Sequence, residues 1–445
     1  MHVRCPWSIY SNVPTRNEQT YNYRIILAME NTHLAGWPDV IVPVETLSDT
    51  GIPFIPQQYI RPLSERPSVN TAESDMPVKI PIIDLAGFTS DEESHKRTLE
   101  AMTDACQDWG FFQVVNHGVD LDDVKRMKQV WREFFDLPME QKKLYANSPV
   151  TYEGYGSRIG VDKAAILDWS DYYFLNLLPT YLKNMEKWPK VPYNLRDVTE
   201  KYTSHMMNLS NVLLKAISNS LQLDEQHLHM AFGGSDDMSA NIRVTYYPKC
   251  PQPELTLGLS PHTDIGGLTL LLLDDTVVGT QVRKENERVT LQPVPGAFIV
   301  NVGDQIQVDN AISIDIPASS SLEARTQYDI ELHSFLSIVI ATIICRENLL
   351  PLVANEWYFR VVIVSNGRYK SAEHRVLANS EKTRVNIAFF CNPGGDLPIA
   401  PANKLVSPMS PALYDPITFN EYRNYTRTKG LNVREQIKPS KVIQG

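Results

Sequence analysis

A change in sequence pattern at Asn241 constrains the fold more than any other feature. From there the chain divides into short runs rich in Val, Ile, Phe and Tyr, which are IRVTYYP, LTLLLLD, RVTLQPV, AFIVNVGDQIQV and RVNIAFFC. Gly, Pro, Asn and Asp separate these runs. Short β-branched and aromatic runs between turn-forming residues are typical of strands. We therefore expect an all-β barrel or sandwich in this half of the chain.

The residues before Asn241 have a mostly helical pattern. SDEESHKRTLEAMTDACQDWG (90–110) begins with Ser90 and acidic residues and ends at a glycine, which are helix start and stop signals. LDDVKRMKQVWREFFDLP is amphipathic and ends at Pro138, and a longer helical pattern fills 194–223. Two short expected strands, IPIIDL and FFQVVNHG, lie on either side of the first helix. We expect a helical layer in front of the β core.

Composition and charge exclude several kinds of partner. The 445 residues carry a formal charge of −10, whereas nucleic acids and anionic membranes attract basic surfaces. The longest strongly apolar stretch, 335–345, is shorter than the roughly 20 residues of a membrane-spanning helix. The five cysteines are scattered and form no CxxC pair, which favours a reduced, cytoplasmic protein. We expect neither a nucleic acid nor a membrane partner.

We divide the chain into four parts. Residues 1–35 are polar and lack a clear period, so we expect a disordered extension, with Met29 as an alternative translation start. Residues 36–235 form the mixed, mostly helical N-terminal region, and 236–410 form the β domain. Residues 411–445 contain a C-terminal helix and tail.

Two side chains in SPHTDIGGLTLLL indicate a metal site. His262 and Asp264 are two positions apart, so on a strand both point to the same face. Two imidazoles and one carboxylate leave three positions of an octahedral ion open, as in non-haem Fe(II) oxygenases. A polar turn at a strand end is the alternative interpretation of this pair. Two later residues are candidates for the second imidazole, His333 in ELHSFLSIV and His374 in KSAEHRVLANS.

An anion-binding residue follows His374. KSAEHRVLANSEKTRVNIAFF predicts a hairpin, with a strand ending near Leu377, a turn at 379–382 and a second strand from Arg384. This would place Arg384 across from His374 in the same barrel mouth. A guanidinium group binds a carboxylate through two hydrogen bonds, which suits a dicarboxylate. Tyr247 supplies a hydroxyl on a strand that leads towards the metal pair.

Four stretches resemble the plant 2-oxoglutarate- and Fe(II)-dependent dioxygenases: NIRVTYYPKCPQPELTLGLSPHTDIGGLTLLL, GAFIVNVGDQIQV, SNGRYKSAEHRV and TRVNIAFF. The resemblance extends from about Trp37 to the C-terminus, with one interruption. It implies a mainly β fold with α, in which a double-stranded β-helix (jelly-roll) core follows a helical N-terminal region. It also implies that Fe(II) is bound by three residues, His262, Asp264 and His374.

The resemblance further implies that Arg384, with Tyr247 beside it, holds the co-substrate 2-oxoglutarate. The family has Arg-x-Ser where this chain has Arg384-Val385-Asn386. Asn386 can still donate a hydrogen bond from its amide, so it remains a co-substrate residue. Because residues two apart on a strand share a face, its larger volume would crowd the carboxylate that Arg384 receives. We expect weaker binding of 2-oxoglutarate.

Three other stretches, WPDVIVPVETLSD, TYEGYGSRIGVDKAAILDWSDYYFLNLLP and FNEYRNYTRTKG, resemble the jasmonate-induced oxygenases. This resemblance implies hydroxylation of jasmonic acid, which removes a hormone precursor, with consumption of O₂ and release of succinate and CO₂. It implies ascorbate as reductant and no catalytic side chain beyond the metal site. Two alternatives are a flavonoid-oxidising dioxygenase, like anthocyanidin synthase or flavonol synthase, and an inactive splice or gene-model product that only binds metal.

The spacing of the histidines departs from the family. His374 lies 112 positions after His262 (374 − 262), about twice the usual separation, because Asp309–Ile363 stands between two motifs that are normally adjacent. His333 belongs to this insert, so we assign His374 as the ligand. Loops of this length are rare in a compact domain, and an exposed FLSIVIATIIC is an aggregation hazard. We interpret 309–363 as a retained intron or aberrant splice product, and a real surface excursion is the alternative.

Four residues are candidates for binding the substrate. Arg423 and Arg427 are four positions apart and share a helix face, and Arg243 is a third cation. All three would suit a substrate carboxylate, whereas the alternative for the helix pair is a solvated basic face. Phe390, six residues after Arg384, shares its strand face and either lines the pocket or packs in the core. Other residues are expected to be structural: Tyr173, Phe174, His117, His227 and His229. The sequence does not indicate an oligomeric state.

Overall fold

The computed structural model describes most of the chain. The described residues are 41–67, 79–149, 151–158, 165–274, 276–285, 287–306, 364–365, 368–407 and 416–429. The expected extension 1–35 lies outside these residues, as do the insert 309–363 with His333 and the tail from 430. What was predicted for those segments stays a prediction.

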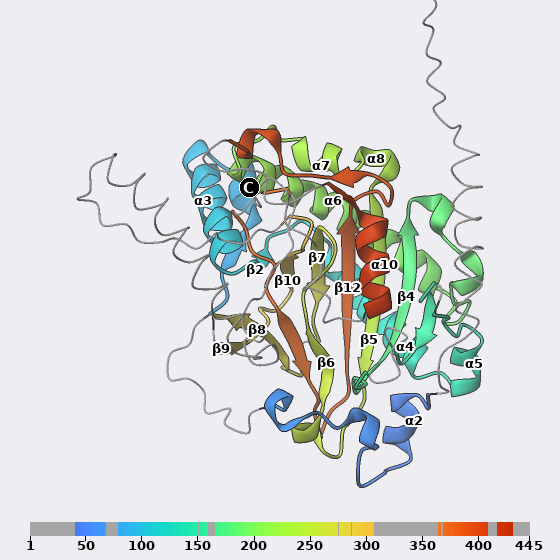
Figure 1. Ribbon diagram of the computed structural model, residues 1–445. Coiled ribbons are helices and arrows are strands. Elements are labelled where there is room, and N and C mark those ends of the chain that lie inside the picture. The colour runs from blue at the N-terminus through green and yellow to red at the C-terminus, as the bar shows by residue number, and fades with distance from the viewer. Residues whose placement is uncertain are drawn as a thin grey trace, which may run out of the picture.

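The larger β-sheet combines strands from both halves of the chain. Its order is β1 (Ile82–Asp84), β2 (Phe111–Val115), β10 (Phe298–Val302), β7 (Leu268–Leu272), β12 (Arg384–Asn392), β5 (Ser239–Tyr247), β4 (Asp171–Leu178) and β3 (Gly154–Gly156). Neighbouring strands are antiparallel except β1 and β2. The four strands of the N-terminal region form the two edges, so this region and the β domain share one sheet (Figure 1).

The smaller sheet forms the second wall of the core. Its order is β6 (Leu257–His262), β11 (His374–Leu377), β8 (Thr280–Lys284) and β9 (Glu287–Thr290). A small apolar cluster joins the two sheets, because Phe111, Leu271 and Ile299 of the larger sheet pack with Val282 of the smaller one. Two sheets enclosing a common interior are the walls of a jelly roll. The predicted jelly-roll core with a helical N-terminal region is confirmed.

The predicted hairpin between His374 and Arg384 is wrong. β11 pairs with β6 and β8, whereas β12 pairs with β5 and β7. The turn between them, in which Asn379 Oδ1 accepts from the amides of Glu381 and Lys382 at 2.8 Å, carries the chain from one sheet to the other. Arg384 nevertheless reaches back to β11, because its Nη2 donates to the carbonyl of Leu377.

Three helices cover the outer face of the larger sheet: α3 (Glu92–Asp108), α4 (Leu121–Phe135) and α6 (Leu195–Ser220). All three confirm the helical patterns, although α3 is capped by Asp91, whose carboxylate accepts from the Ser94 amide at 2.9 Å, rather than by Ser90. Along α4, Val124, Met127 and Trp131 recur at helical spacing and are buried. Burial of each such side chain contributes roughly 1.5–3 kcal/mol to the stability of the fold. These contacts hold α4 against the larger sheet.

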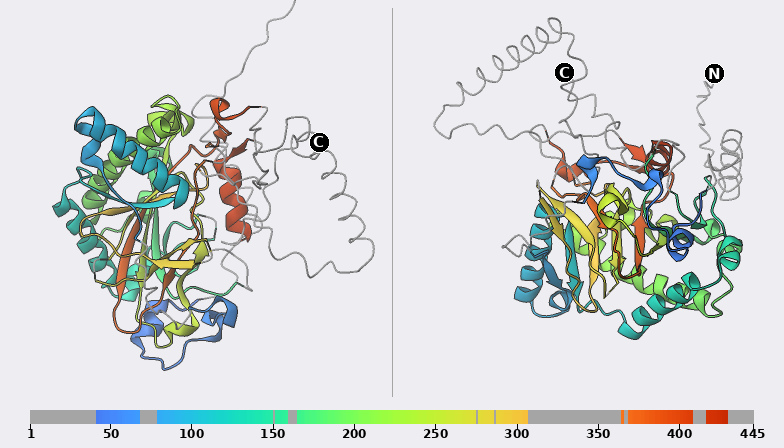
Figure 2. Two further views of the ribbon diagram at one scale, coloured as in Figure 1. Left: turned by 90° about the vertical axis from the view of Figure 1, so that its left-hand side faces the viewer. Right: turned by 90° about the horizontal axis from the view of Figure 1, so that it is seen from below.

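The C-terminal helix α10 (Phe419–Lys429) lies on the other side of the larger sheet from α3, α4 and α6 (Figure 2). A two-stranded sheet of β13 (Pro398–Ile399) and β14 (Ile417–Thr418) precedes it. The remaining helices are short: α2 (Val44–Asp49), α5 (Met139–Lys143), α7 (His227–Ala231) and α8 (Gly234–Asp237). Within the described ranges, no helix has both the length and the apolar character needed to cross a membrane.

Candidate active site

Three potential metal ligands meet at the open edge between the two sheets. His262 at the end of β6 lies directly opposite His374 at the start of β11 in the antiparallel register. Asp264 follows two residues after His262, and its Oδ1 lies 3.9 Å from His262 Nε2 and 3.8 Å from His374 Nε2. The three donor atoms lie within 4.8 Å of one another. The fold therefore brings together the pair seen in SPHTD and the later of the two candidate histidines.

Hydrogen bonds orient all three side chains. The Nδ1 atoms of His262 and His374 lie 2.8 and 3.2 Å from the backbone carbonyl oxygens of Ser260 and Ala372. Nδ1–H therefore donates to these carbonyls, which leaves the Nε2 lone pairs directed at the shared centre. Asn301 Nδ2 donates to Asp264 Oδ2 at 2.8 Å, so Oδ1 is the oxygen that faces the imidazoles.

The electrostatic environment keeps His262 and Asp264 in their metal-binding forms. Burial lowers the pKa of His262 to about 3, and the neighbouring His374 acts in the same direction. Burial alone would raise the pKa of Asp264, but the two imidazoles and Asn301 hold it below its usual value. At neutral pH His262 is therefore neutral and Asp264 is ionised, the forms that ligate metals. Two imidazoles and one carboxylate with an open side fit a ferrous ion.

A buried cation lies beyond the metal ligands. Arg384 at the start of β12 is opposite Tyr247 at the end of β5, and its Cζ lies 4.7 Å from the centre of the Tyr247 ring. Arg384 is only 3% exposed, and burial lowers the pKa of its guanidinium group. Among the described residues its Nε has no hydrogen-bond partner and no carboxylate pairs with it. Two backbone carbonyls accept from the guanidinium group and Asp274 acts on it at longer range, but a buried charge without a direct ion pair is costly, so this site favours a bound anion.

Asn386 shares the interior face of β12 with Arg384. Its Oδ1 accepts a hydrogen bond from the backbone amide of Asp274 at 3.1 Å. This contact fixes the orientation of the side-chain amide, because an N–H donor needs the oxygen as its acceptor. The Nδ2 group is consequently the end of Asn386 that is available to a ligand.

The interior face of the larger sheet is partly open next to this site. Arg243 on β5 lies opposite Phe174 on β4 and Ala388 on β12, and all three are half-buried. Phe390 is also half-buried, two residues further along β12 on the same face. The Cζ atom of Arg243 lies 4.3 Å from the centre of the Tyr172 ring. No carboxylate in the described part of the chain forms an ion pair with Arg243, and its buried Nε has no partner.

Of the two candidate arginines of the C-terminal helix, Arg423 has a described side chain. Arg423 on α10 is half-buried and its Nη2 donates to Asn420 Oδ1 at 2.7 Å. Arg427 lies one turn further along α10, and its side chain lies outside the described part. The expectation of a shared substrate-binding face stays a prediction.

Several residues expected to be structural are placed as such. Tyr173 is fully buried between the larger sheet and α4. His117 accepts from the Val119 amide through Nδ1 and contacts the Gly296 carbonyl through Nε2, and His229 contacts Asn211. Phe174 lies half-buried on the interior face opposite Arg243, so its expected packing role stays a prediction. The larger sheet presents alternate residues to opposite faces, which separates Phe174 from its neighbour Tyr173.

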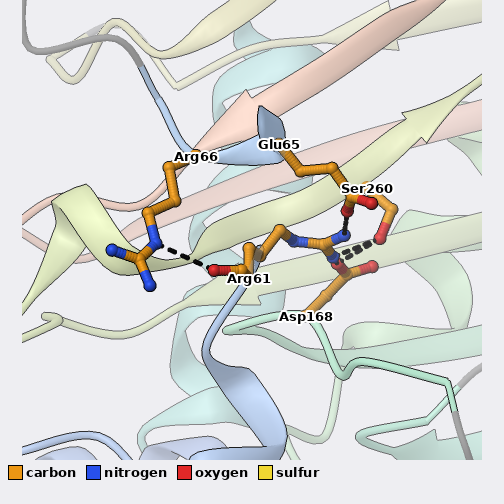
Figure 3. A network of polar contacts seen from close by, with 5 residues as sticks. All are labelled: Arg61, Glu65, Arg66, Asp168 and Ser260. Carbon is orange, nitrogen blue, oxygen red and sulfur yellow. Dashed lines mark hydrogen bonds and ion pairs between the residues drawn. The ribbon is translucent and has the colours of Figure 1, made fainter. Parts of the chain in front are cut away.

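Sequence patterns did not identify the residues that support the ligands. Arg61, from the segment before β1, donates through Nη2 to Asp168 Oδ1 at 2.7 Å and to Ser260 Oγ at 2.6 Å (Figure 3). Ser260 also donates to Asp168 at 2.5 Å, while its carbonyl holds His262. Asn301 could have been found as the single polar residue inside the apolar strand FIVNV. The Arg61 network has no such local signal.

Comparisons with known proteins agree with this geometry. Residues 80–191 match the family model "non-haem dioxygenase in morphine synthesis N-terminal", and 238–311 together with 352–393 match the 2OG-Fe(II) oxygenase superfamily. Jasmonate-induced oxygenase 4 of Arabidopsis thaliana is 43% identical over 90% of this chain and 97% of its own length. A leucoanthocyanidin dioxygenase of Malus domestica is 31% identical over 85% of this chain and 93% of its own length.

A solved structure extends the agreement to the whole fold. The crystal structure of JOX2 in complex with 2OG, Fe and JA has a TM-score of 0.73 and 42% sequence identity to this chain. The match covers 91% of this chain and all of that one. The chain therefore belongs to the 2OG-Fe(II) oxygenase superfamily and, within it, resembles the jasmonate-induced oxygenases in sequence and structure.

Proposed function

We propose that this dioxygenase hydroxylates a small carboxylic acid and that the acid is jasmonic acid. The observation that carries the proposal is Arg243, a cation on the interior face of the barrel without a carboxylate partner among the described residues. A carboxylate substrate would neutralise this charge in a partly desolvated site, where the interaction is strong. The similarity to JOX2, whose crystal structure contains JA, supports the same substrate.

We assign the first step, binding of metal and co-substrate, to six residues. They are the metal ligands His262, Asp264 and His374, and the 2-oxoglutarate residues Arg384, Tyr247 and Asn386. The three ligands are two imidazoles and one carboxylate, so three positions of an octahedral ion would stay open for small molecules. Arg384 would receive the distal carboxylate of 2-oxoglutarate, and the Asn386 amide would donate to it.

When bound, Fe(II) and 2-oxoglutarate would activate O₂, so that one oxygen atom of O₂ would enter succinate as 2-oxoglutarate loses CO₂ and the other would be inserted into the substrate as a hydroxyl group. The chain's own contribution is to bind, orient and shield. Ser260, Ala372 and Asn301 hold the ligating atoms in place, which limits the reorganisation needed during the reaction. The apolar cluster with Phe111 and Leu271 closes the interior behind the ligands and keeps water from that side.

We assign substrate orientation to the half-open strip on the interior face of the larger sheet. Arg243 would bind the carboxylate of jasmonic acid, and Phe390 and Phe174 would contact its hydrocarbon part. Arg423 and Arg427 on α10 would add positive charge at the entrance. Two or three cations around one carboxylate make binding selective for an acid over a neutral molecule of similar size.

A flavonoid-oxidising activity is the second candidate from the sequence, and the site supports it less. A neutral flavonoid would desolvate the Arg243 guanidinium without a directly paired carboxylate, since Asp168 acts on it only at longer range, and this costs binding energy. The third candidate, an inactive product that only binds metal, depends on the insert 309–363.

Residues on both sides of this insert support a complete core without it. The amide of Val364 donates to the carbonyl of Gln305 at 3.3 Å, and Ser365 Oγ donates to the carbonyl of Ile306 at 2.6 Å. The superfamily match stops at 311 and resumes at 352, so residues 352–363 of the expected insert belong to the match and only 312–351 fall outside it. We infer that 312–351 are an addition to the catalytic fold and that the chain segments on both sides take their family positions.

Two further assignments accompany the proposal. We expect ascorbate to keep the iron reduced between turnovers, as in the related dioxygenases. We also expect a cytoplasmic location, which is supported by three buried, unpaired cysteines, Cys106, Cys250 and Cys391.

Succinate release tests the proposed function. The full chain and a variant lacking 309–363 are each supplied with Fe(II), 2-oxoglutarate and O₂, and jasmonic acid, a flavonoid or no substrate is added. We expect succinate and hydroxylated product in amounts that depend on jasmonic acid. Turnover of the flavonoid alone would support the second candidate. Activity only in the shortened chain would identify the full-length form as the inactive product.

A further inference from the structure

A chain of buried polar contacts connects the C-terminal helix to the metal ligands. The hydroxyl of Tyr422 on α10 donates to Asp304 Oδ2 at 2.7 Å. The same oxygen accepts from Thr263 Oγ1 at 3.2 Å, and Thr263 lies between His262 and Asp264 in the sequence. Tyr422 and Asp304 are each only 3% exposed. A carboxylate oxygen bonded to two hydroxyls in a buried site holds both donors in a fixed position.

The backbone around Asp304 is bonded to the same loop. The amide of Asp304 donates to the carbonyl of Asp264 at 2.8 Å, and the amide of Gly303 donates to the carbonyl of Gly267 at 2.7 Å. At Gly303 the two segments approach so closely that a Cβ atom would lie 2.2 Å from the carbonyl oxygen of Gly266. These contacts hold the turn after β10 against residues 263–267, which we call the metal loop, and α10 contacts this turn at Asp304.

The residue next to Tyr422 on α10 is Arg423, which the proposed function places at the substrate entrance. One helical turn thus carries both a cation for the substrate and a hydroxyl bonded to the metal loop. We propose that Tyr422 is a positioning residue that couples the seating of α10 at the substrate entrance to the geometry of the metal loop through Asp304 and Thr263. The part of this proposal that concerns substrate rests on the proposed function, and the part that concerns metal does not.

Metal binding without substrate tests the contact itself. Mn(II) serves as a redox-stable probe, titrated without O₂ into the full chain and into Tyr422→Phe, which removes only the hydroxyl. We expect Mn(II) to bind the variant about fivefold more weakly, because one lost hydrogen bond is worth about 1 kcal/mol. Tyr369→Phe is the matched control, since its hydroxyl is also buried and bonded, to Ser220, away from the site. A fall in Tm without a change in Mn(II) affinity would overturn the proposal in favour of a purely structural role.

A double-mutant cycle distinguishes a connected network from two separate contacts. Thr263→Val removes the second donor to Asp304 at nearly constant volume, and Thr263→Ser retains it. If Tyr422 and Thr263 act through the same oxygen, their effects on Mn(II) affinity will not add, and Thr263→Ser will bind Mn(II) like the unmodified chain. Additive effects, or equal effects of valine and serine, would contradict the network. Faster hydrogen exchange of amides 263–267 in Tyr422→Phe but not in Tyr369→Phe is the second expected sign.

The coupling to substrate is measured by repeating the Mn(II) titration with 2-oxoglutarate and jasmonic acid present. We expect the acid to tighten Mn(II) binding in the unmodified chain and to lose most of this effect in Tyr422→Phe, because linked sites affect each other equally. Equilibrium dialysis of jasmonic acid separates the two ways to fail. If the acid does not bind at all, the proposed function is wrong, whereas if it binds without tightening Mn(II), the coupling is wrong.

Discussion

His262 and His374 face each other across neighbouring antiparallel strands, with ring centres 4.2 Å apart, although 112 positions (374 − 262) separate them in the chain. This pairing supports His374 as the third ligand, whereas His333 lies outside the described residues. Each ring is held through Nδ1 by a carbonyl two residues before it, at Ser260 and Ala372. The same local hydrogen bond, from Nδ1 to a backbone carbonyl two residues earlier, thus orients both imidazoles.

Replacing the assigned third ligand, His374, should greatly weaken metal binding. We expect His374→Ala to weaken Mn(II) binding by roughly 100-fold or more, since loss even of groups that only support ligands costs about 10–100-fold. His333→Ala is the control, because His333 belongs to the insert and is not assigned a role. Anaerobic titration of both variants measures the difference. Weaker metal binding in His333→Ala, with His374→Ala unaffected, would reverse the assignment.

Asn386 provides a test of co-substrate binding with two opposite outcomes. In Asn386→Asp the second carboxylate oxygen would face 2-oxoglutarate, so repulsion should raise the KM for 2-oxoglutarate by roughly 30-fold or more. Asn386→Ser relieves crowding beside Arg384 and should lower this KM by about threefold to tenfold. It also removes the acceptor for the Asp274 amide, which costs about 1 kcal/mol of stability. An unchanged KM in the serine variant would contradict the crowding hypothesis.

Gly279 leaves room for the Arg384 side chain. A Cβ atom at this position would lie 2.1 Å from Arg384 Nη1, so Gly279→Ala must displace the guanidinium group. We expect a higher KM for 2-oxoglutarate with little change in Mn(II) affinity, because the metal ligands are on other strands. Val278→Ala, at the exposed neighbouring position, should leave both values unchanged. An equal loss of metal affinity in Gly279→Ala would point to general disruption of the barrel instead.

Arg243 is the cation on which the substrate proposal depends. Arg243→Met keeps much of the side-chain volume and removes the charge, so the KM for jasmonic acid should rise by roughly 10- to 100-fold, the worth of a hydrogen bond between charged groups. The KM for 2-oxoglutarate should stay the same. Arg97→Met, on the exposed face of α3, is the control. Succinate release at varied jasmonic acid concentrations measures the effect, and an unaltered KM would remove Arg243 from the substrate site.

Glu153 should make the stability of the protein depend on pH. Burial raises the pKa of Glu153 to about 7, although the Asn176 amides oppose the shift. Because the folded chain then binds more protons than the unfolded chain between about pH 4.5 and 7, the free energy of unfolding falls as pH rises through this window. The upper limit of this contribution is about 3 kcal/mol.

Denaturant unfolding at pH 5 and pH 8 measures this contribution of Glu153. The difference between the two pH values should shrink in Glu153→Gln and persist in Glu100→Gln, whose side chain is 63% exposed. The same pH dependence in Glu153→Gln as in the unmodified chain would assign it to other groups.

Local patterns predicted the elements well and their partners poorly. The positions of the long helices α3, α4 and α6 followed from their apolar periodicity, and α3 and α4 also begin at capping aspartates, Asp91 and Asp120. The His374 and Arg384 strands looked like a hairpin because only a short turn separates them. Strand pairing depends instead on which apolar faces meet in the completed core, and this depends on residues far away in the sequence.

The cluster of His262, Asp264 and His374 could be predicted because the family motifs around these residues are specific, although the separation of the two histidines departs from the family. Of the groups that orient these ligands, only Asn301 has a local signal in the sequence. The two backbone carbonyls have none, and Asp304 receives its bonds from α10 and from the metal loop, more than 100 positions apart. Phe174 and Tyr173 illustrate the same limit at single-residue scale. These two adjacent aromatic residues lie on opposite faces of β4. Only the register of β4 with β5 shows which of them faces the interior of the barrel.

The contacts of Gln305 with Val364 and of Ile306 with Ser365 have a consequence for the evolution of this chain. Where two backbone positions already touch, a connecting segment adds only loop-closure entropy, about 0.6 kcal/mol for each doubling of its length. A splicing change or an engineered fusion that inserts residues at this junction would therefore reduce the stability of the fold only slightly, even though the junction lies within two residues of Asp304. The junction is a tolerant attachment point for additional sequence, close enough to the metal loop for that sequence to acquire a role in activity.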